Sequence, residues 1–158
     1  MTESTKIFVD SSVIVEYLKE NERAVNLIDT ILNRTDLEVY INDIVYSEVA
    51  YVYIRTKSGK SHLTLKKDKS LVSIIGKEFL SSAYPLLDVL NFLVVNKDVI
   101  SIANNFIEKY GLLPNDALIL ATCKYYKIGF LATLDVEDFK KPCEEERIVL
   151  ISDSGDLS

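Results

Sequence analysis

The sequence predicts an α/β fold in three layers, with a central five-stranded parallel sheet and helices on both of its faces. Short apolar runs alternate with longer helical patterns, which is typical of parallel strands joined by crossover helices. The first run, residues 7–9, has no polar alternation, so we expect it to be buried on both faces. With 158 residues, 48% of them hydrophobic, the chain is long enough to bury a substantial core.

Local patterns place the elements along the chain. Ser11 or Ser12 is expected to cap a helix over 13–18, and Asn21 to cap a second helix with an apolar stripe. Further strands are expected at 37–41, 93–95, 128–133 and 148–151. Further helices are expected at 44–56, 65–82, 97–110 and 114–122, with a loop over 59–64 and a helical turn reaching Phe92.

Composition limits the setting of the protein. Residues 1–151 are expected to form one domain, followed by a loose polar tail over 152–158. No apolar run in the sequence approaches the roughly 20 residues of a membrane span, and the polar start has no secretory pattern. The two cysteines, Cys123 and Cys143, do not make a disulfide framework. These features predict a soluble, cytoplasmic protein.

Four acids occupy positions where acids are uncommon. Asp10 ends the buried first strand, Glu48 points along the apolar stripe of its helix, Asp116 opens the most apolar helix, and Asp135 follows the fourth strand. Each has a simpler explanation on its own. Asp116 could do no more than favour a helix start, by about 0.3–1 kcal/mol. Asp135 could do no more than begin a turn, and Glu48 could pair with a nearby lysine or arginine.

Together, the four carboxylates indicate a metal site. Two lie at the carboxyl ends of strands, where open α/β sheets place their ligands, and two lie on helices that could lean over that edge. Carboxylates brought together repel one another unless divalent cations bind between them. Mg²⁺ or Mn²⁺ suits such an all-oxygen site, and a metal-bound water can attack a phosphodiester without a histidine base.

The chain resembles the PIN-domain ribonucleases, most closely the VapC-type toxins of toxin–antitoxin pairs. The resemblance covers about residues 6–151, with the motifs in the order of that family. The matching segments are Phe8-Val9-Asp10-Ser11-Ser12, Ser47-Glu48-Val49, Pro114-Asn115-Asp116-Ala117-Leu118-Ile119-Leu120-Ala121 and Thr133-Leu134-Asp135-Val136-Glu137-Asp138-Phe139.

This resemblance implies a PIN-like fold and an Mg²⁺- or Mn²⁺-dependent endoribonuclease. It makes Asp10, Glu48, Asp116 and Asp135 the catalytic and metal-binding residues, supported by Ser11, Thr133 and Asp138. It also implies a homodimer and an antitoxin partner. The region 63–93 and the tail make the chain longer than the compact toxins it resembles. The alternative is a PIN-like RNA-binding or scaffold module in an RNA-processing complex, without cleavage activity.

Two surface features complete the expectations. The net charge of −6 argues against broad binding of nucleic acid, but a basic segment is opposed only by Asp68 and is expected to steer RNA to the acidic site. Its residues are Arg55, Lys57, Lys60, Lys66, Lys67 and Lys69. The apolar segments 71–80 and 86–95 exceed what one sheet face needs, which favours a dimer.

Overall fold

The computed structural model describes residues 4–158 and contains a five-stranded sheet. The strands are β1 (Thr5–Val9), β2 (Leu37–Asn42), β3 (Asn91–Leu93), β4 (Phe130–Ala132) and β5 (Val149–Ile151). Their spatial order is β3-β2-β1-β4-β5, and every neighbouring pair is parallel. The predicted five-stranded parallel sheet is therefore confirmed.

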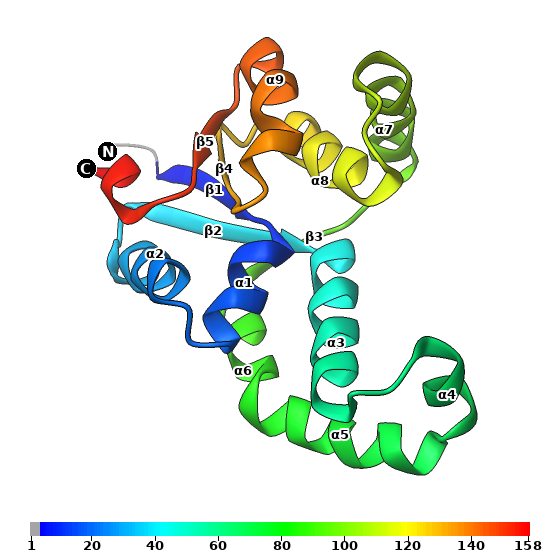
Figure 1. Ribbon diagram of the computed structural model, residues 1–158. Coiled ribbons are helices and arrows are strands. Elements are labelled where there is room, and N and C mark those ends of the chain that lie inside the picture. The colour runs from blue at the N-terminus through cyan, green and yellow to red at the C-terminus, as the bar shows by residue number, and fades with distance from the viewer. Residues whose placement is uncertain (1–3) are drawn as a thin grey trace.

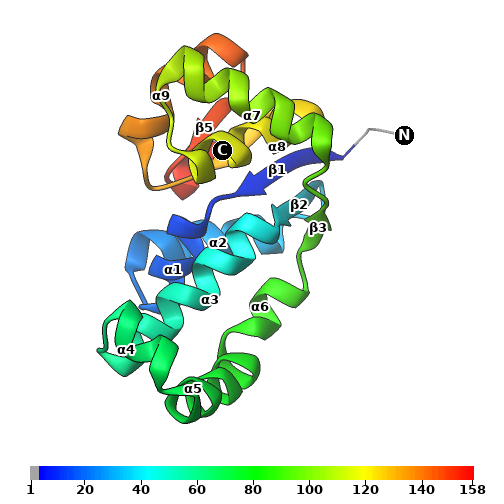
Figure 2. The same ribbon diagram turned by 90° about the vertical axis from the view of Figure 1, so that its right-hand side faces the viewer.

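Helices cover both faces of the sheet, as the sequence predicted. They are α1 (Ser11–Leu18), α2 (Glu22–Asn33), α3 (Asp43–Ser58), α4 (His62–Lys67), α5 (Lys69–Ser82), α6 (Tyr84–Asp88), α7 (Lys97–Tyr110), α8 (Pro114–Tyr125), α9 (Val136–Glu146) and the 3₁₀ helix η1 (Ser154–Leu157). Figure 1 shows α1, α2 and α3 on one side of the sheet and α7, α8 and α9 on the other. Figures 1 and 2 both show α4 and α5 at the end of α3 that is remote from the sheet.

The buried central strand fixes the position of the site. Ile7, Phe8 and Val9 of β1 are fully buried, because neighbouring strands and helices on both faces enclose them. From β1 the sheet extends through β2 and β3 in one direction and through β4 and β5 in the other. The carboxyl ends of β1 and β4 therefore flank the point where the strand order reverses, which is where ligands bind in open α/β sheets.

Several predicted boundaries are wrong for local reasons. The third strand is 91–93 instead of 93–95, because it pairs with β2 there and Asn91 also donates from Nδ2 to Val39 O at 3.0 Å. The predicted helix over 65–82 is interrupted at Asp68, whose side chain accepts a hydrogen bond from Leu71 N and caps α5. The expected loop over 59–64 contains the start of α4.

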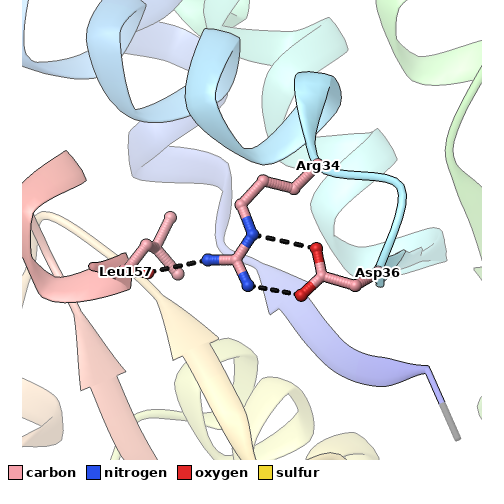
Figure 3. Close-up of polar contacts among 3 residues, drawn as sticks. All are labelled: Arg34, Asp36 and Leu157. Carbon is pink, nitrogen blue, oxygen red and sulfur yellow. Dashed lines mark hydrogen bonds and ion pairs between the residues drawn. The ribbon is translucent and has the colours of Figure 1, made fainter. Parts of the chain in front are cut away.

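The last residues are ordered, so the expectation of a loose tail is wrong. Asp153 and Asp156 form a capping box at the two ends of the first turn of η1. Arg34 donates from Nη1 to Leu157 O at 2.7 Å, and the same guanidinium pairs with Asp36 (Figure 3). Arg23 donates to Ser152 O at 2.7 Å. Arg23 and Arg34, at the two ends of α2, thus bind the tail through its backbone carbonyls.

Across residues 4–158, the helices are all too short or too polar to cross a membrane.

Candidate acidic site

Asp10 is the fixed point of the site. It follows β1, only 2% of its surface is exposed, and its Oδ1 accepts a hydrogen bond from Ser11 N at 2.9 Å. Asp10 itself is therefore the N-cap of α1, and the expectation that Ser11 or Ser12 caps this helix is wrong. Its Oδ2 accepts hydrogen bonds from the hydroxyls of Ser12 and Thr133, each at 2.8 Å.

These two hydroxyls also hold the loop after β4. Ser12 Oγ accepts a hydrogen bond from Leu134 N at 3.0 Å, and Thr133 Oγ1 accepts one from Asp135 N at 3.0 Å. Each hydroxyl thus donates to Asp10 and accepts from the loop backbone. Burial raises the pKa of Asp10, and the hydrogen bonds from Thr133, Ser12 and Ser11 oppose the rise. Asp10 is consequently held in one orientation at the switch point.

Glu48 approaches Asp10 from α3. Ser11 Oγ donates to Glu48 Oε1 at 3.2 Å and lies 3.5 Å from Asp10 Oδ1, so this hydroxyl stands between the two carboxylates. Glu48 is half-buried, and burial followed by the charge of Asp10 raises its pKa. Hydrogen bonds from the side chains of Ser11 and Asn115 oppose that rise.

Asp116 experiences the fields of all the other site acids. It lies in the first turn of α8 and is half-buried. Burial raises the pKa of Asp116 to about 6, and the charges of four other carboxylates add to the rise. In decreasing order of effect, they are Asp10, Asp138, Glu48 and Asp135. In residues 4–158, no hydrogen bond to the Asp116 carboxylate offsets them.

Asp135 and Asp138 form the open side of the cluster. Asp135 is exposed and occupies the N-cap position of α9 without capping it by a side-chain hydrogen bond. Burial, then the charges of Asp10 and Asp138, raises the pKa of Asp135. Asp138 lies in the first turn of α9 and is exposed. The sequence had suggested only a turn after Asp135 as the simpler explanation, whereas the structure has a helix there.

A buried polar bridge ties α3 to α8. Asn42 caps α3 through Val45 N and donates from Nδ2 to Thr122 Oγ1 at 2.9 Å. Thr122 donates in turn to Leu118 O at 2.7 Å, and both bridging side chains are fully buried. Glu48 lies six residues further along α3, and Asp116 lies six residues back along α8.

The bridge and the acids together define how these helices pack. Because Asn42 meets Thr122 and the charge of Glu48 reaches Asp116, α3 and α8 run in opposite directions. The Asn42–Thr122 hydrogen bond joins the two helices at one point of this antiparallel packing, six residues from each acid.

The donor set fits a hard divalent cation. All its charged members are carboxylates, which Mg²⁺ and Mn²⁺ prefer. Burial, and after it the charges of the other carboxylates, raise the pKa of Asp116. Among residues 4–158, no three acidic, histidine or cysteine side chains are already close enough to enclose an ion. The carboxylates thus share one electrostatic field, and gathering them around a cation requires side-chain movement.

Two site residues were missed from the sequence. Ser12 was considered only as a helix cap, whereas its hydroxyl binds Asp10. Asn115 lies within the family motif but was assigned no role, whereas a hydrogen bond from its side chain opposes the rise in the pKa of Glu48. The fixed spacing of Asp10 and Ser12, two residues apart after a strand, is the signal that could have identified the first.

The basic residues follow Glu48 along α3 and continue on the segment after it. Arg55 and Lys57 are in the last turn of α3, Lys60 lies between α3 and α4, and the other three are on α4 and at the start of α5. Lys57 is paired with Glu78 at 3.5 Å. Of the six, Arg55 and Lys57 are closest in sequence to Glu48, and Lys60, Lys66, Lys67 and Lys69 follow on exposed positions.

Comparisons with known proteins agree on one family. The model of the PIN domain matches residues 7–145. Ribonuclease VapC2 of Methanocaldococcus jannaschii is 37% identical over 139 residues, which cover 88% of this chain and 90% of the relative. Ribonuclease VapC6 of the same organism is 35% identical over 143 residues, covering 87% and 92%.

Solved structures share the fold at lower identity. FitAcB from Neisseria gonorrhoeae superposes with a TM-score of 0.62 at 21% identity, covering 92% of this chain and 96% of that one. VapBC2 from Rickettsia felis, bound to a DNA fragment from its promoter, gives a TM-score of 0.58 at 18% identity, covering 93% and 98%.

Proposed function

This chain belongs to the PIN-domain family, and we propose that it is an endoribonuclease that uses Mg²⁺ or Mn²⁺ to hydrolyse RNA phosphodiester bonds. The names of its two archaeal relatives support the ribonuclease assignment. The observation that carries the metal dependence is Asp116, whose pKa is raised to about 6 by burial and by four neighbouring carboxylates. In a protein that served only as a scaffold, this repulsion would cost stability without any benefit. In a metal-binding protein, the bound divalent cation would offset the repulsion.

Each side chain has a distinct part in this proposal. Asp10, Glu48, Asp116 and Asp135 would hold the cation, and Asp138 adds charge behind Asp116 and Asp135. When bound, the cation supplies an activated water and stabilises the leaving oxygen. Ser12 and Thr133 keep Asp10 in place, and Ser11 orients Glu48. His62, the only histidine, is on α4, so the acids alone would carry the proton chemistry.

A cleavage assay tests the proposal. Purified protein is incubated with single-stranded and structured RNA, with Mg²⁺, Mn²⁺ or EDTA. We expect metal-dependent cleavage, and we expect Asp116→Asn to abolish it. Asp98→Asn is the matched control, because Asp98 also lies in the first turn of a helix, on α7. Absence of cleavage with either metal on any RNA would favour the RNA-binding or scaffold module instead.

An antitoxin partner is part of the proposal. Several structures with this fold are toxin–antitoxin complexes, including one from Klebsiella pneumoniae. A groove of about 500 Å³ between α1, α3 and α5, with Val15, Leu18 and Val52 in its lining, offers an apolar surface to a partner segment. Co-purification with the product of an adjoining reading frame would support an antitoxin. A protein that is harmless on expression alone would contradict a toxin role.

We also propose that the protein forms a homodimer and that it is located in the cytoplasm. Exposed apolar side chains on α5 and around β3 would be covered in a dimer. They are Ile74, Leu80, Val89, Phe92 and Val94. Light scattering that shows a stable monomer at micromolar concentration would contradict the dimer.

A further inference from the structure

An exposed stripe on α3 leads away from the acidic site. Glu48, Tyr51 and Arg55 are spaced at i, i+3 and i+7, so they share one face of the helix. From Glu48 to Arg55 the helix rises about 10 Å. A strand of RNA whose scissile phosphate lies at the acids could therefore reach this stripe with the adjoining nucleotide.

Tyr51 is held in place although it is exposed. Its hydroxyl lies 2.8 Å from Nδ1 of His62, and the two rings meet edge to face with centroids 5.6 Å apart. Arg55 Nη1 donates to the same hydroxyl at 3.4 Å. Because a guanidinium can only donate, the tyrosine oxygen accepts there and its proton is available to His62. The ring is thus oriented while 40% of the residue stays exposed.

Arg55 carries a charge that is free to meet a phosphate. Its guanidinium carbon lies 5.9 Å from the centroid of the Tyr51 ring. Within the part of the chain that the structure describes, no acidic side chain forms an ion pair with Arg55. Lys57, two residues further along α3, is in contrast paired with Glu78. Near a cluster of carboxylates, such a free cation offsets the repulsion of an approaching phosphate.

We propose that Tyr51 and Arg55 form a subsite for single-stranded RNA, in which Tyr51 stacks on a base and Arg55 binds the adjoining phosphate. The proposal rests on the ribonuclease function and adds where the substrate is held. Aromatic stacking accepts any unpaired base, and stacking surfaces beside positive charge are how proteins bind single strands without reading sequence. The hydrogen bond and the edge-to-face contact with His62 fix the orientation of the Tyr51 ring. A duplex, whose bases are already stacked, does not use Tyr51.

Binding, measured without cleavage, tests the subsite. All variants carry Asp116→Asn and are assayed in EDTA, so that cleavage is absent. The probe is a fluorescein-labelled 12-nucleotide single-stranded RNA, compared with its duplex by fluorescence anisotropy. We expect Tyr51→Leu to weaken single-strand binding about tenfold and Tyr51→Phe, which keeps the ring, to change it less than about threefold. The matched control is Tyr125→Leu, because Tyr125 is similarly exposed, at 38%, but lies at the far end of α8.

The charge contribution is read from the salt dependence. Arg55→Gln should reduce the slope of log K against log salt concentration by about 0.7, the value for one phosphate contact on a single strand. Lys57→Gln should leave the slope nearly unchanged, because Glu78 already neutralises Lys57. Single-strand binding by Tyr51→Leu equal to that of the parent, or an equal loss on the duplex, would overturn the stacking role. If binding falls as expected but the wild type cleaves no RNA with metal, the ribonuclease proposal fails and the subsite stands.

Discussion

Neutralising Asp116 should stabilise the metal-free protein. The pKa of Asp116 is raised from 3.8 to about 6, mainly by burial and then by the neighbouring carboxylates. A rise of about two units corresponds to about 3 kcal/mol of preference for the neutral form. Because the side chain is only half-buried, solvent screening reduces this to about 1.5 kcal/mol. Asp116→Asn keeps the shape of the side chain and removes the charge.

A competing effect reduces the gain without reversing it. Asp116 also lies in the first turn of α8, where a negative charge is favourable by about 0.3–1 kcal/mol. The expected net stabilisation is therefore about 1 kcal/mol, or about 2–4 °C in the melting temperature of a chain of this size. Asp98→Asn loses only the helix-start contribution, so this control should melt at or slightly below the wild-type temperature.

The dependence on pH has a definite sign. A carboxyl group whose pKa is higher in the folded protein than in the unfolded chain destabilises the fold once it is ionised. The penalty from Asp116 is absent below pH 3.8, grows between pH 3.8 and about 6, and is fully present above that pH. The melting temperatures of wild type and Asp116→Asn should converge as the pH falls toward 4 and separate by pH 7.

Metal ions should reverse the order of stability. At a concentration one hundred times the dissociation constant, a ligand of the folded state adds about 2.7 kcal/mol. Mn²⁺ should therefore raise the melting temperature of the wild type and have much less effect on Asp116→Asn. The assay is differential scanning fluorimetry in EDTA and in Mn²⁺, at pH 4 and pH 7.5. A variant that melts below wild type in EDTA at pH 7.5 and yet keeps the full Mn²⁺ shift would refute the reasoning.

Further predictions concern the residues that hold the site together. Thr133→Val removes a hydroxyl from buried Asp10 and should cost about 1–3 kcal/mol in urea unfolding. Thr30→Val, whose hydroxyl donates to Asn26 O of its own helix, should stay within about 0.5 kcal/mol; equal losses would contradict a special role for Thr133. Thr122→Val leaves Asn42 Nδ2 without its partner and should cost about 1–3 kcal/mol of unfolding free energy. It should also lower kcat more than it changes KM, and an unchanged kcat in a folded variant would show that the bridge does not position the acids. Arg34→Ala should speed hydrogen exchange in η1 with little change in melting temperature, and unchanged exchange would show that other contacts hold the tail.

The position of Asp10 could be predicted because it depends on local sequence alone. A run of buried apolar residues that stops at an acid places that acid at the carboxyl end of a strand. The cap at Asn21 was equally predictable, and Asn21 caps α2 as expected. Asn96 caps α7 in the same way. Gly111 also ends α7 in the left-handed conformation, with φ of 69°, as a glycine after a helix commonly does.

Other features depend on contacts that a linear pattern does not contain. α9 was not predicted as a helix, and it contains Pro142, a residue type that usually interrupts helices. Phe139 and Cys143, four residues apart and both buried, hold it against the core. β3 is a three-residue edge strand with Asn91 and Phe92 exposed, so it shows no burial pattern to read. The Asn42–Thr122 bridge joins residues 80 apart in sequence.

The two acids at the centre of the site differ in how they are held. Asp10 accepts hydrogen bonds from the Ser11 amide and from two hydroxyls, one of them on Thr133 directly after the neighbouring strand β4, so its orientation is set before any ligand arrives. Asp116 has a raised pKa and comparable burial to Glu48 but no compensating hydrogen bond within residues 4–158. Asp116 is therefore the acid of the site whose charge is least compensated, and the Asn42–Thr122 hydrogen bond holds its helix, α8, against α3, which carries Glu48. A carboxylate fixed by hydrogen bonds thus shares one electrostatic field with a carboxylate that lacks them, so neutralising Asp116 is the change expected to relieve most repulsion in the metal-free protein.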